Sequence, residues 1–259
     1  MARIFLFFYL SAFLNLYVFP QTIKILPNTF YASGEVLKYN LRYGFIIGGE
    51  VKLEMKESNT ENSNLLHIIG TAQTKGIADK IFLVHDVYES YIDRESSLPV
   101  FAIQNVSEGR KYRYYNDVKY YRQNGTLISK KSGEHKVTDK NILDMMSVFY
   151  YVRRLDYSKA KEGDTYKLLT FFSDEEFPLE LRYRGIETIE TKWGKISCLK
   201  FAPIVEPGRV FKSKDDMYIW YTDDENRIPI QVTMEMIVGH ITVEMTDYTG
   251  LKKPLVFKN

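Results

Sequence analysis

The sequence predicts an all-β protein. Its antiparallel strands form one curved sheet or barrel-like meander, with one central helix packed on it. Apolar and polar residues alternate with period two along most of the chain, which is the pattern of strands with one buried face. The 20 tyrosines and 16 phenylalanines also favour strands. One segment, 139–155, instead spaces its apolar residues as a helix does.

The N-terminal segment has the features of a secretory signal peptide. Arg3 precedes an apolar run at 4–19, which only Ser11 and Asn15 interrupt. One basic residue before a short apolar core is typical of a leader, and the run is shorter than the roughly 20 residues that cross a bilayer comfortably. We therefore predict a signal peptide at 1–22, no transmembrane span after its cleavage, and export to the periplasm or cell envelope.

The remainder, 28–259, is predicted to be a single β-rich domain. Undivided β-sandwiches and barrels often reach roughly 200–250 residues, a length that buries a core without disulfides. Cys198 is the one cysteine of the chain, so no internal disulfide can form, and its place in a strand pattern indicates packing rather than reactivity. A net charge of +2 gives no argument for binding nucleic acid or an anionic membrane surface.

The first half of the domain is predicted to be a series of strands joined by turns. A stretch that runs up to Gly44 and a second at 50–56 form a hairpin around Gly48-Gly49. Asn124-Gly125 is a tight-turn signal. The further strands of this half are predicted at 65–74, 81–92, 100–107 and 111–121.

The second half resumes the same pattern after residue 160. Val238-Gly239 separates its last two strands. Even spacing of this kind favours a meander folded into a barrel or a strongly curved sheet. The predicted strands are 165–172, 179–191, 196–202, 217–222, 228–236 and 240–248.

The predicted helix, 139–155, lies between the two sets of strands. Thr138 or Asp139 is expected to cap its start, and Arg153 and Arg154 at its end suit the helix dipole. We expect the helix to lie in the concavity of the sheet or to plug one opening. Its apolar face is Ile142, Met145, Met146, Phe149 and Val152.

Four short motifs in order resemble the exported bacterial family called domain of unknown function 3108. They are Gly34-Glu35 before Leu37-x-Tyr39 with Gly48-Gly49-Glu50; Asp144-x-x-Ser147-x-x-Tyr150-x-x-Arg153; Trp193-Gly194-Lys195 with Lys200-x-x-Pro203; and Trp220-x-x-Asp223-Asp224 with Arg227-x-Pro229. The resemblance implies an extracytoplasmic, mostly antiparallel β protein. It implies no agreed activity and no catalytic residues.

Polar residues of the helix have two interpretations each. Four of them share one helical row: Asp144, Ser147, Tyr151 and Arg154. In one interpretation they face a cavity. In the other, which we favour, they cap the helix, bond its backbone and complement its dipole. Arg153 lies closer to the apolar face and needs a carboxylate partner there. Glu35 and Glu50 are the candidate partners, because both follow glycines where a backbone can approach closely. We favour a structural Arg–Glu clamp over a ligand site.

The sequence predicts no catalytic residue, no metal site and no cofactor, so an enzyme is less favoured. The four histidines form no paired zinc spacing, and the acidic turn at 223–226 lacks the Asp-x-Asp-x-Asp-Gly pattern of a calcium loop. The chain has no Gly-x-Ser-x-Gly elbow and no phosphate-binding glycine loop. A glycan hydrolase needs two facing carboxylates, and the sequence assigns no such pair.

Basic and aromatic residues alternate at 111–115 and 119–122. This pattern can stack on single-stranded nucleic acid or on sugar faces. Export argues against nucleic acid as a partner. Cross-strand aromatic and cation–π pairs between two adjacent strands explain the pattern without any ligand.

The leading functional hypothesis is a non-catalytic envelope protein that binds a lipid or acyl chain in the concave face of the sheet. Flexible methionines suit varied partners, although they serve equally well as core. The alternative is an envelope structural or assembly factor that binds a partner protein through its Tyr-rich strands or a sheet edge. The predicted ligand-binding residues are Met145, Met146, Phe149, Tyr150 and Arg153.

Overall fold

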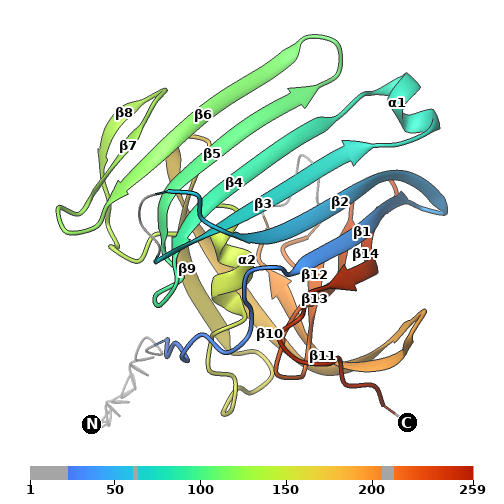
Figure 1. Cartoon of the computed structure of the whole chain (residues 1–259). Helices are drawn as coiled ribbons and strands as arrows, with labels where there is room; N and C mark the ends of the chain where they lie inside the picture. Colours follow the sequence, from blue (N-terminus) through green and yellow to red (C-terminus); the bar gives the residue numbers. More distant parts are fainter. Residues whose placement is uncertain (1–22, 61–63, 206–212, 259) are drawn as a thin grey trace, which may run out of the picture.

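An antiparallel sheet of 14 strands makes up most of the protein. The computed structural model describes residues 23–60, 64–205 and 213–258 (Figure 1). The predicted signal peptide at 1–22 lies outside the described residues. No helix of the described segments is long and apolar enough to span a membrane.

The elements follow one another along the chain with short connections. The first half contains β1 (Val36–Tyr43), β2 (Ile46–Glu57), β3 (Leu65–Thr74), α1 (Ile77–Ile81), β4 (His85–Asp93), β5 (Pro99–Glu108), β6 (Tyr112–Tyr121), β7 (Thr126–Ser129) and β8 (Gly133–Lys136). The second half contains α2 (Ser147–Val152), β9 (Thr165–Phe172), β10 (Glu175–Thr191), β11 (Gly194–Pro203), β12 (Met217–Thr222), β13 (Pro229–Glu235) and β14 (His240–Thr249).

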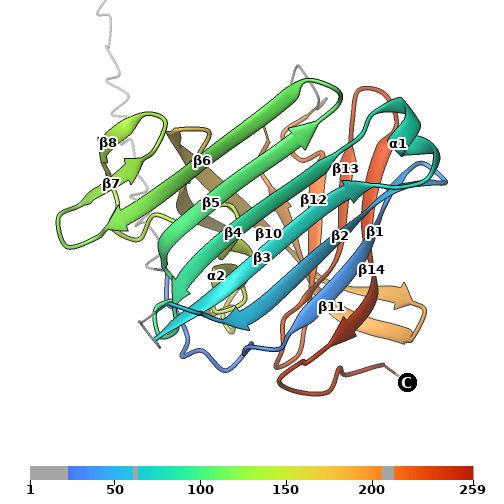
Figure 2. The ribbon, with the colours of Figure 1, turned by 45° about the horizontal axis from the view of Figure 1, so that its top comes forward.

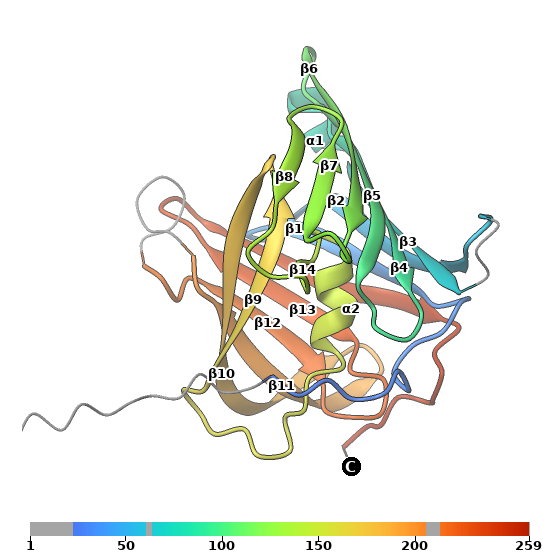
Figure 3. The same ribbon diagram turned by 90° about the vertical axis from the view of Figure 1, so that its left-hand side faces the viewer.

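The sheet is a meander that does not close between β8 and β9. Each strand pairs with its neighbours in sequence, and β1 pairs with β14, so the order runs from β8 through β1 and β14 to β9. The two halves face each other across α2, which lies in the concavity (Figure 3). Register shifts after Lys38, Leu41 and Tyr91 add local twist, which helps the sheet curl. The predicted all-β curved meander with one central helix is confirmed.

The core fills the space between α2 and the two halves of the sheet. One buried cluster includes Leu37, Ile68 and Trp220, and a second includes Tyr157 and Phe201. In most strands the buried residues alternate with exposed or half-exposed ones, as in β7, so each strand presents one face inward. The alternation that predicted the strands therefore also builds the core.

The helix is shorter than the predicted 139–155 and comprises Ser147–Val152. The backbone of Leu143 is bonded to β9 instead, because its N–H donates to Leu169 O at 2.9 Å and its C=O accepts from Phe171 N at 2.8 Å. This bridge competes with helical hydrogen bonds and delays the start of α2. The expected caps Thr138 and Asp139 consequently lie outside the helix.

Three further predictions about elements were wrong in detail. The predicted strand 81–92 begins at His85, since α1 includes Ile81. β7 and β8 were missed, although the turn at Asn124-Gly125 that leads to them was recognised. The basic and aromatic residues at 111–122 belong to β6 and its ends rather than to two adjacent strands. The cations that lie over the rings of Tyr115 and Tyr114 in β6 come from Lys130 and Lys131, which follow β7.

Candidate functional site

A buried ion pair fixes the end of α2 to Glu35, the residue directly before β1. Arg153 donates from Nη1 to Glu35 Oε1 at 2.6 Å and from Nη2 to Oε2 at 2.8 Å. It also donates to the backbone oxygens of Asn226 and Phe30, both at 2.9 Å. Both charged side chains are buried. The predicted structural clamp is therefore confirmed with Glu35, whereas Glu50 instead bonds Gln73 and Lys75.

Two tyrosine rings enclose this ion pair. The Arg153 guanidinium carbon lies 5.1 Å from the ring centre of Tyr31 and 5.2 Å from that of Tyr150. Burial lowers the pKa of Arg153, but the Glu35 carboxylate more than offsets this and raises it above the ordinary value. Burial raises the pKa of both tyrosines, so the phenols stay neutral. The surroundings of Arg153 are thus fully protein, which makes it a structural residue.

Asp144 begins α2 by capping it. Its Oδ1 accepts the backbone N–H groups of Met146 at 2.7 Å and Ser147 at 3.0 Å, and its Oδ2 accepts from the Ser90 hydroxyl at 2.5 Å. The Ser147 hydroxyl accepts the N–H of Asp144 at 2.9 Å in return. Burial raises the pKa of Asp144, although these hydrogen bonds oppose the shift. Asp144 and Ser147 therefore follow the capping interpretation, whereas Arg154 of the same row donates to Leu26 O at 2.9 Å and to the Ser97 hydroxyl.

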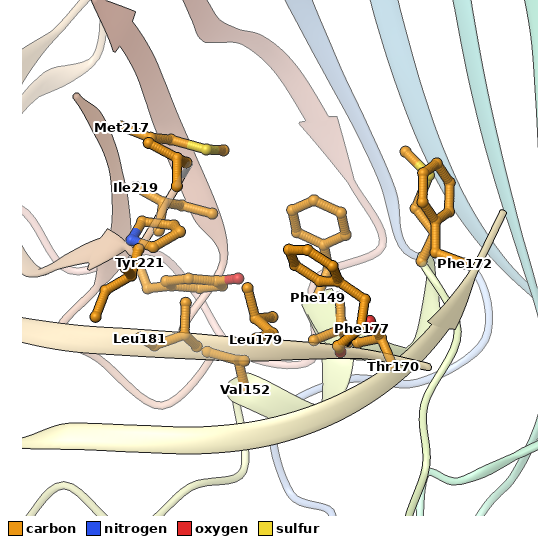
Figure 4. A pocket seen from close by; sticks show the side chains of 15 residues that line it. Phe149, Val152, Thr170, Phe172, Phe177, Leu179, Leu181, Met217, Ile219 and Tyr221 are labelled. Carbon is orange, nitrogen blue, oxygen red and sulfur yellow. Dashed lines mark hydrogen bonds between the residues drawn. The ribbon is translucent and has the colours of Figure 1, made fainter. Parts of the chain in front are cut away.

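A cavity of about 540 Å³ lies between α2 and strands β9 to β12 (Figure 4). Its walls are almost entirely aliphatic and aromatic, and the hydroxyl of Thr170 at its edge is already bonded to Phe177 O at 3.0 Å. Phe172 and Phe177, which are 39% and 40% exposed, lie where the cavity meets solvent. The helix side is Met145, Val148, Phe149 and Val152; the sheet side is Thr170, Phe172, Phe177, Leu179, Leu181, Pro203, Ile204, Val205, Met217, Ile219 and Tyr221.

The five predicted ligand-binding residues divide between two faces of α2. Met145 and Phe149 line the cavity. Met146, Tyr150 and Arg153 belong to the neighbouring face and are buried; Met146 and Tyr150 lie in the cluster that includes residues of β1 to β3 and the N-terminal segment. Met146 packs on Gly70, where an added Cβ would collide with its sulfur. The division follows the helical repeat, because residues spaced three and four apart share one face.

Sequence reasoning missed the sheet wall of the cavity. Phe172 precedes the β9–β10 turn, and Phe177, Leu179 and Leu181 follow it. Apolar residues at alternate positions of this hairpin were the signal available in the sequence. The signal could not be used alone, because a filled core produces the same alternation.

The site offers little for catalysis. Among the described residues, no three or more His, Cys, Asp or Glu side chains are arranged to hold a metal ion. Cys198 is buried, and burial raises the pKa of its thiol to about 12. Burial also raises the pKa of Tyr221, which keeps this cavity residue neutral. An apolar, uncharged cavity favours binding of an apolar molecule over bond chemistry.

Comparison with known proteins places the chain among proteins without assigned activity. The family model described as protein of unknown function (DUF3108) matches residues 38–246. No curated protein is significantly similar in sequence.

One solved structure supports the fold. A β-barrel-like protein of domain of unknown function DUF1849 from Brucella abortus is similar with a TM-score of 0.53 and 12% identity, covering 88% of this chain and 98% of that one. The hypothetical protein CT021 from Chlamydia trachomatis aligns over 86% of this chain and 90% of that one, with a TM-score of 0.34 and 10% identity, and adds nothing to the assignment.

Proposed function

The chain belongs to the DUF3108 family, and we propose that it binds one lipid or other amphipathic molecule in the cavity between α2 and β9–β12. We further propose that it is a non-catalytic protein, exported through its leader to the periplasm or cell envelope. In this role the apolar part of the ligand occupies the cavity, and its polar end stays near Phe172 and Phe177, where the cavity meets solvent.

The size and lining of the cavity carry the proposal. Small-molecule sites are concave, mostly apolar and roughly 300–1,000 Å³ in volume. At about 540 Å³, this cavity lies within that range. An apolar hollow left open to solvent costs free energy, because its walls lose the dispersion contacts of a filled core. A bound acyl chain would supply those contacts.

The contacts that hold α2 in place also support the proposed binding role. One wall of the cavity is the helix, and the other face of the helix is held by the Arg153–Glu35 pair and the Asp144 cap. A helix this short is not stable by itself. Its tertiary anchors therefore keep the cavity open in the absence of ligand, which lowers the cost of ordering the site on binding.

Binding of a fluorescent fatty acid, dansyl-undecanoic acid, tests the proposal. We expect saturable 1:1 binding with a blue shift of the dansyl emission. Leu179→Arg places a charge in the cavity wall and should weaken binding at least tenfold. Ile128→Arg is the matched control, because Ile128 is an exposed residue of β7 outside the cavity lining. Equal binding by Leu179→Arg and the control, or no binding by the wild type, would refute the proposal.

The alternative is an envelope structural or assembly factor that binds a partner protein. An open sheet edge can recruit a strand, and the sheet has edges at β8 and β9. β8 has only four residues, and Leu143 occupies Leu169 O and Phe171 N of β9, so the edge of β9 that remains for a partner strand lies before Leu169. Exposed Tyr112 and Tyr115 of β6 are the other surface. Crosslinking in intact cells that traps a stoichiometric protein partner, lost in Tyr112→Ser/Tyr115→Ser, would favour this role.

A further inference from the structure

Several apolar turns meet at one end of the meander. In an antiparallel meander, alternate turns lie at the same end of the sheet. The β1–β2 turn, the β3–β4 connection with α1, the β5–β6 turn and the β13–β14 turn are together at this end (Figure 2). Hydrogen bonds join them: Gly44 N to His240 O at 3.1 Å, Lys75 N to Gly48 O at 3.0 Å, and Gly109 N to Leu83 O at 2.7 Å.

The large apolar side chains of these turns are turned outward. Phe45 is 89% exposed, Ile81 79%, and Ile77 and Val238 72% each. α1 has no buried residue at all, although Ile77 and Ile81 lie one turn apart on the same face. We call this group the apolar rim, and define it as Phe45, Ile46, Ile47, Ile77, Ile81, Phe82, Leu83, Ile237 and Val238.

We propose that the apolar rim docks the protein on an anionic lipid surface. Clustered exposed apolar groups mark interaction sites. The rim consists of separate protruding tips rather than a flat face, and such tips can enter the headgroup region individually. Exposed cations lie beside them at Lys80, Arg110 and Lys111.

The local charge is complementary to anionic lipids. Across the two neighbouring turns and the residues beside them, 74–84 and 108–113, the cations are Lys75, Lys80, Arg110, Lys111 and Arg113, and the acids are Asp79 and Glu108. Lys75 is paired with Glu50 at 2.9 Å. Basic residues near an anionic surface contribute about 1 kcal/mol each. These two turns therefore carry a small local excess of cations, which the near-neutral charge of the whole chain does not indicate.

The cavity lies toward the same end. Met217, a cavity residue, pairs with Met234 two residues before the β13–β14 hairpin begins to turn. Phe172 lies at the end of β9, in the turn region of β9–β10 that belongs to this end of the meander. A docked protein would thus present the cavity toward the lipid. The docking itself does not depend on the cavity being a binding site.

Vesicle flotation tests the docking. The protein is purified from the cell envelope, and its N-terminal residue is determined to exclude a retained leader. With vesicles of equal phosphatidylglycerol and phosphatidylcholine, we expect the wild type to float. Phe45→Ser/Ile81→Ser should reduce the partition coefficient at least tenfold, as should high salt or vesicles of phosphatidylcholine alone. The matched control is Val256→Ser, an exposed residue near Lys195 and the opposite turns, which should float as the wild type does.

A tryptophan placed in the rim provides a second readout. Phe45→Trp should shift its emission to the blue on vesicles and be quenched by brominated acyl chains, whereas Val256→Trp should not. Unchanged flotation of the rim variant, or an unshifted Phe45→Trp, would overturn the proposal. The proposal would also be overturned if the wild type sediments as a dimer and binds no vesicles, and the rim variant sediments as a monomer. Retained binding of dansyl-undecanoic acid by the rim variant would show that docking and ligand binding are separate.

Discussion

The Arg153–Glu35 pair gives the sharpest stability prediction. Arg153→Met removes the four hydrogen bonds of the guanidinium and leaves the Glu35 carboxylate buried without its cation. Breaking a buried ion pair in this way costs about 3–5 kcal/mol, since the remaining charge keeps its desolvation penalty. Domains are stable by only about 5–15 kcal/mol, so the variant should be marginally folded.

Urea unfolding followed by tryptophan fluorescence measures this loss. The matched control is Lys38→Met, which breaks the half-exposed pair between Lys38 and Asp247 and should cost less than about 1 kcal/mol. The double variant Arg153→Met/Glu35→Leu removes both charges and should recover at least about 2 kcal/mol of the single variant's loss.

Two results would refute this reasoning. The first is that the free energy of unfolding of Arg153→Met lies within about 1 kcal/mol of the wild type, because a buried carboxylate without a partner should destabilise the protein by more than this. The second is a double variant no more stable than the single one. That outcome would assign the cost to lost packing of the Arg153 side chain against Tyr31 and Tyr150 instead of to the charge.

Three further predictions concern other polar groups. Asp144→Ala should lower the free energy of unfolding by about 1–2 kcal/mol because two N–H groups at the start of α2 lose their acceptor, whereas Asp144→Asn should retain most of it in the same urea assay. Partial burial opposes ionisation of Asp174, but hydrogen bonds from neighbouring side chains of β6, β7 and the β7–β8 turn hold its pKa below the ordinary value. A lowered pKa adds stability that is present above the unfolded-state pKa and is lost as the pH falls, so the wild type should lose more stability below about pH 4 than Asp174→Asn. The Cys198 thiol should react with a thiol reagent only in denaturant; rapid labelling of the native protein would show that the strand opens.

The strands and the ion pair could be predicted because both follow from local rules. Period-two alternation places one side of each strand in the core, so β3, β9 and β12 were located closely from the sequence. A buried arginine needs a carboxylate partner, and that requirement narrowed the candidates to Glu35 and Glu50, of which Glu35, 118 residues away in the sequence, is the partner. These arguments need no knowledge of which strands are neighbours.

The cavity and the extent of α2 depend on tertiary contacts that no local rule contains. Met145 and Met146 are adjacent in sequence, yet one lines the cavity and the other packs on Gly70, because the position of the helix in the concavity decides its two faces. The start of α2 was missed because Leu143 bonds to a strand that follows it by more than 20 residues. Ile81 ends α1 instead of joining β4, and its side chain is exposed there, so its apolar character did not indicate a buried strand position.

Native mass spectrometry of the protein purified from the cell envelope without detergent tests the central claim most directly. The proposed function predicts one lipid or fatty-acid molecule per chain, identified after organic extraction. The ligand should be lost in Leu179→Arg and retained in Ile128→Arg. A wild-type protein that carries no apolar ligand, and that takes up none when incubated with envelope lipids, would contradict the proposal that the cavity between α2 and β9–β12 is a binding site.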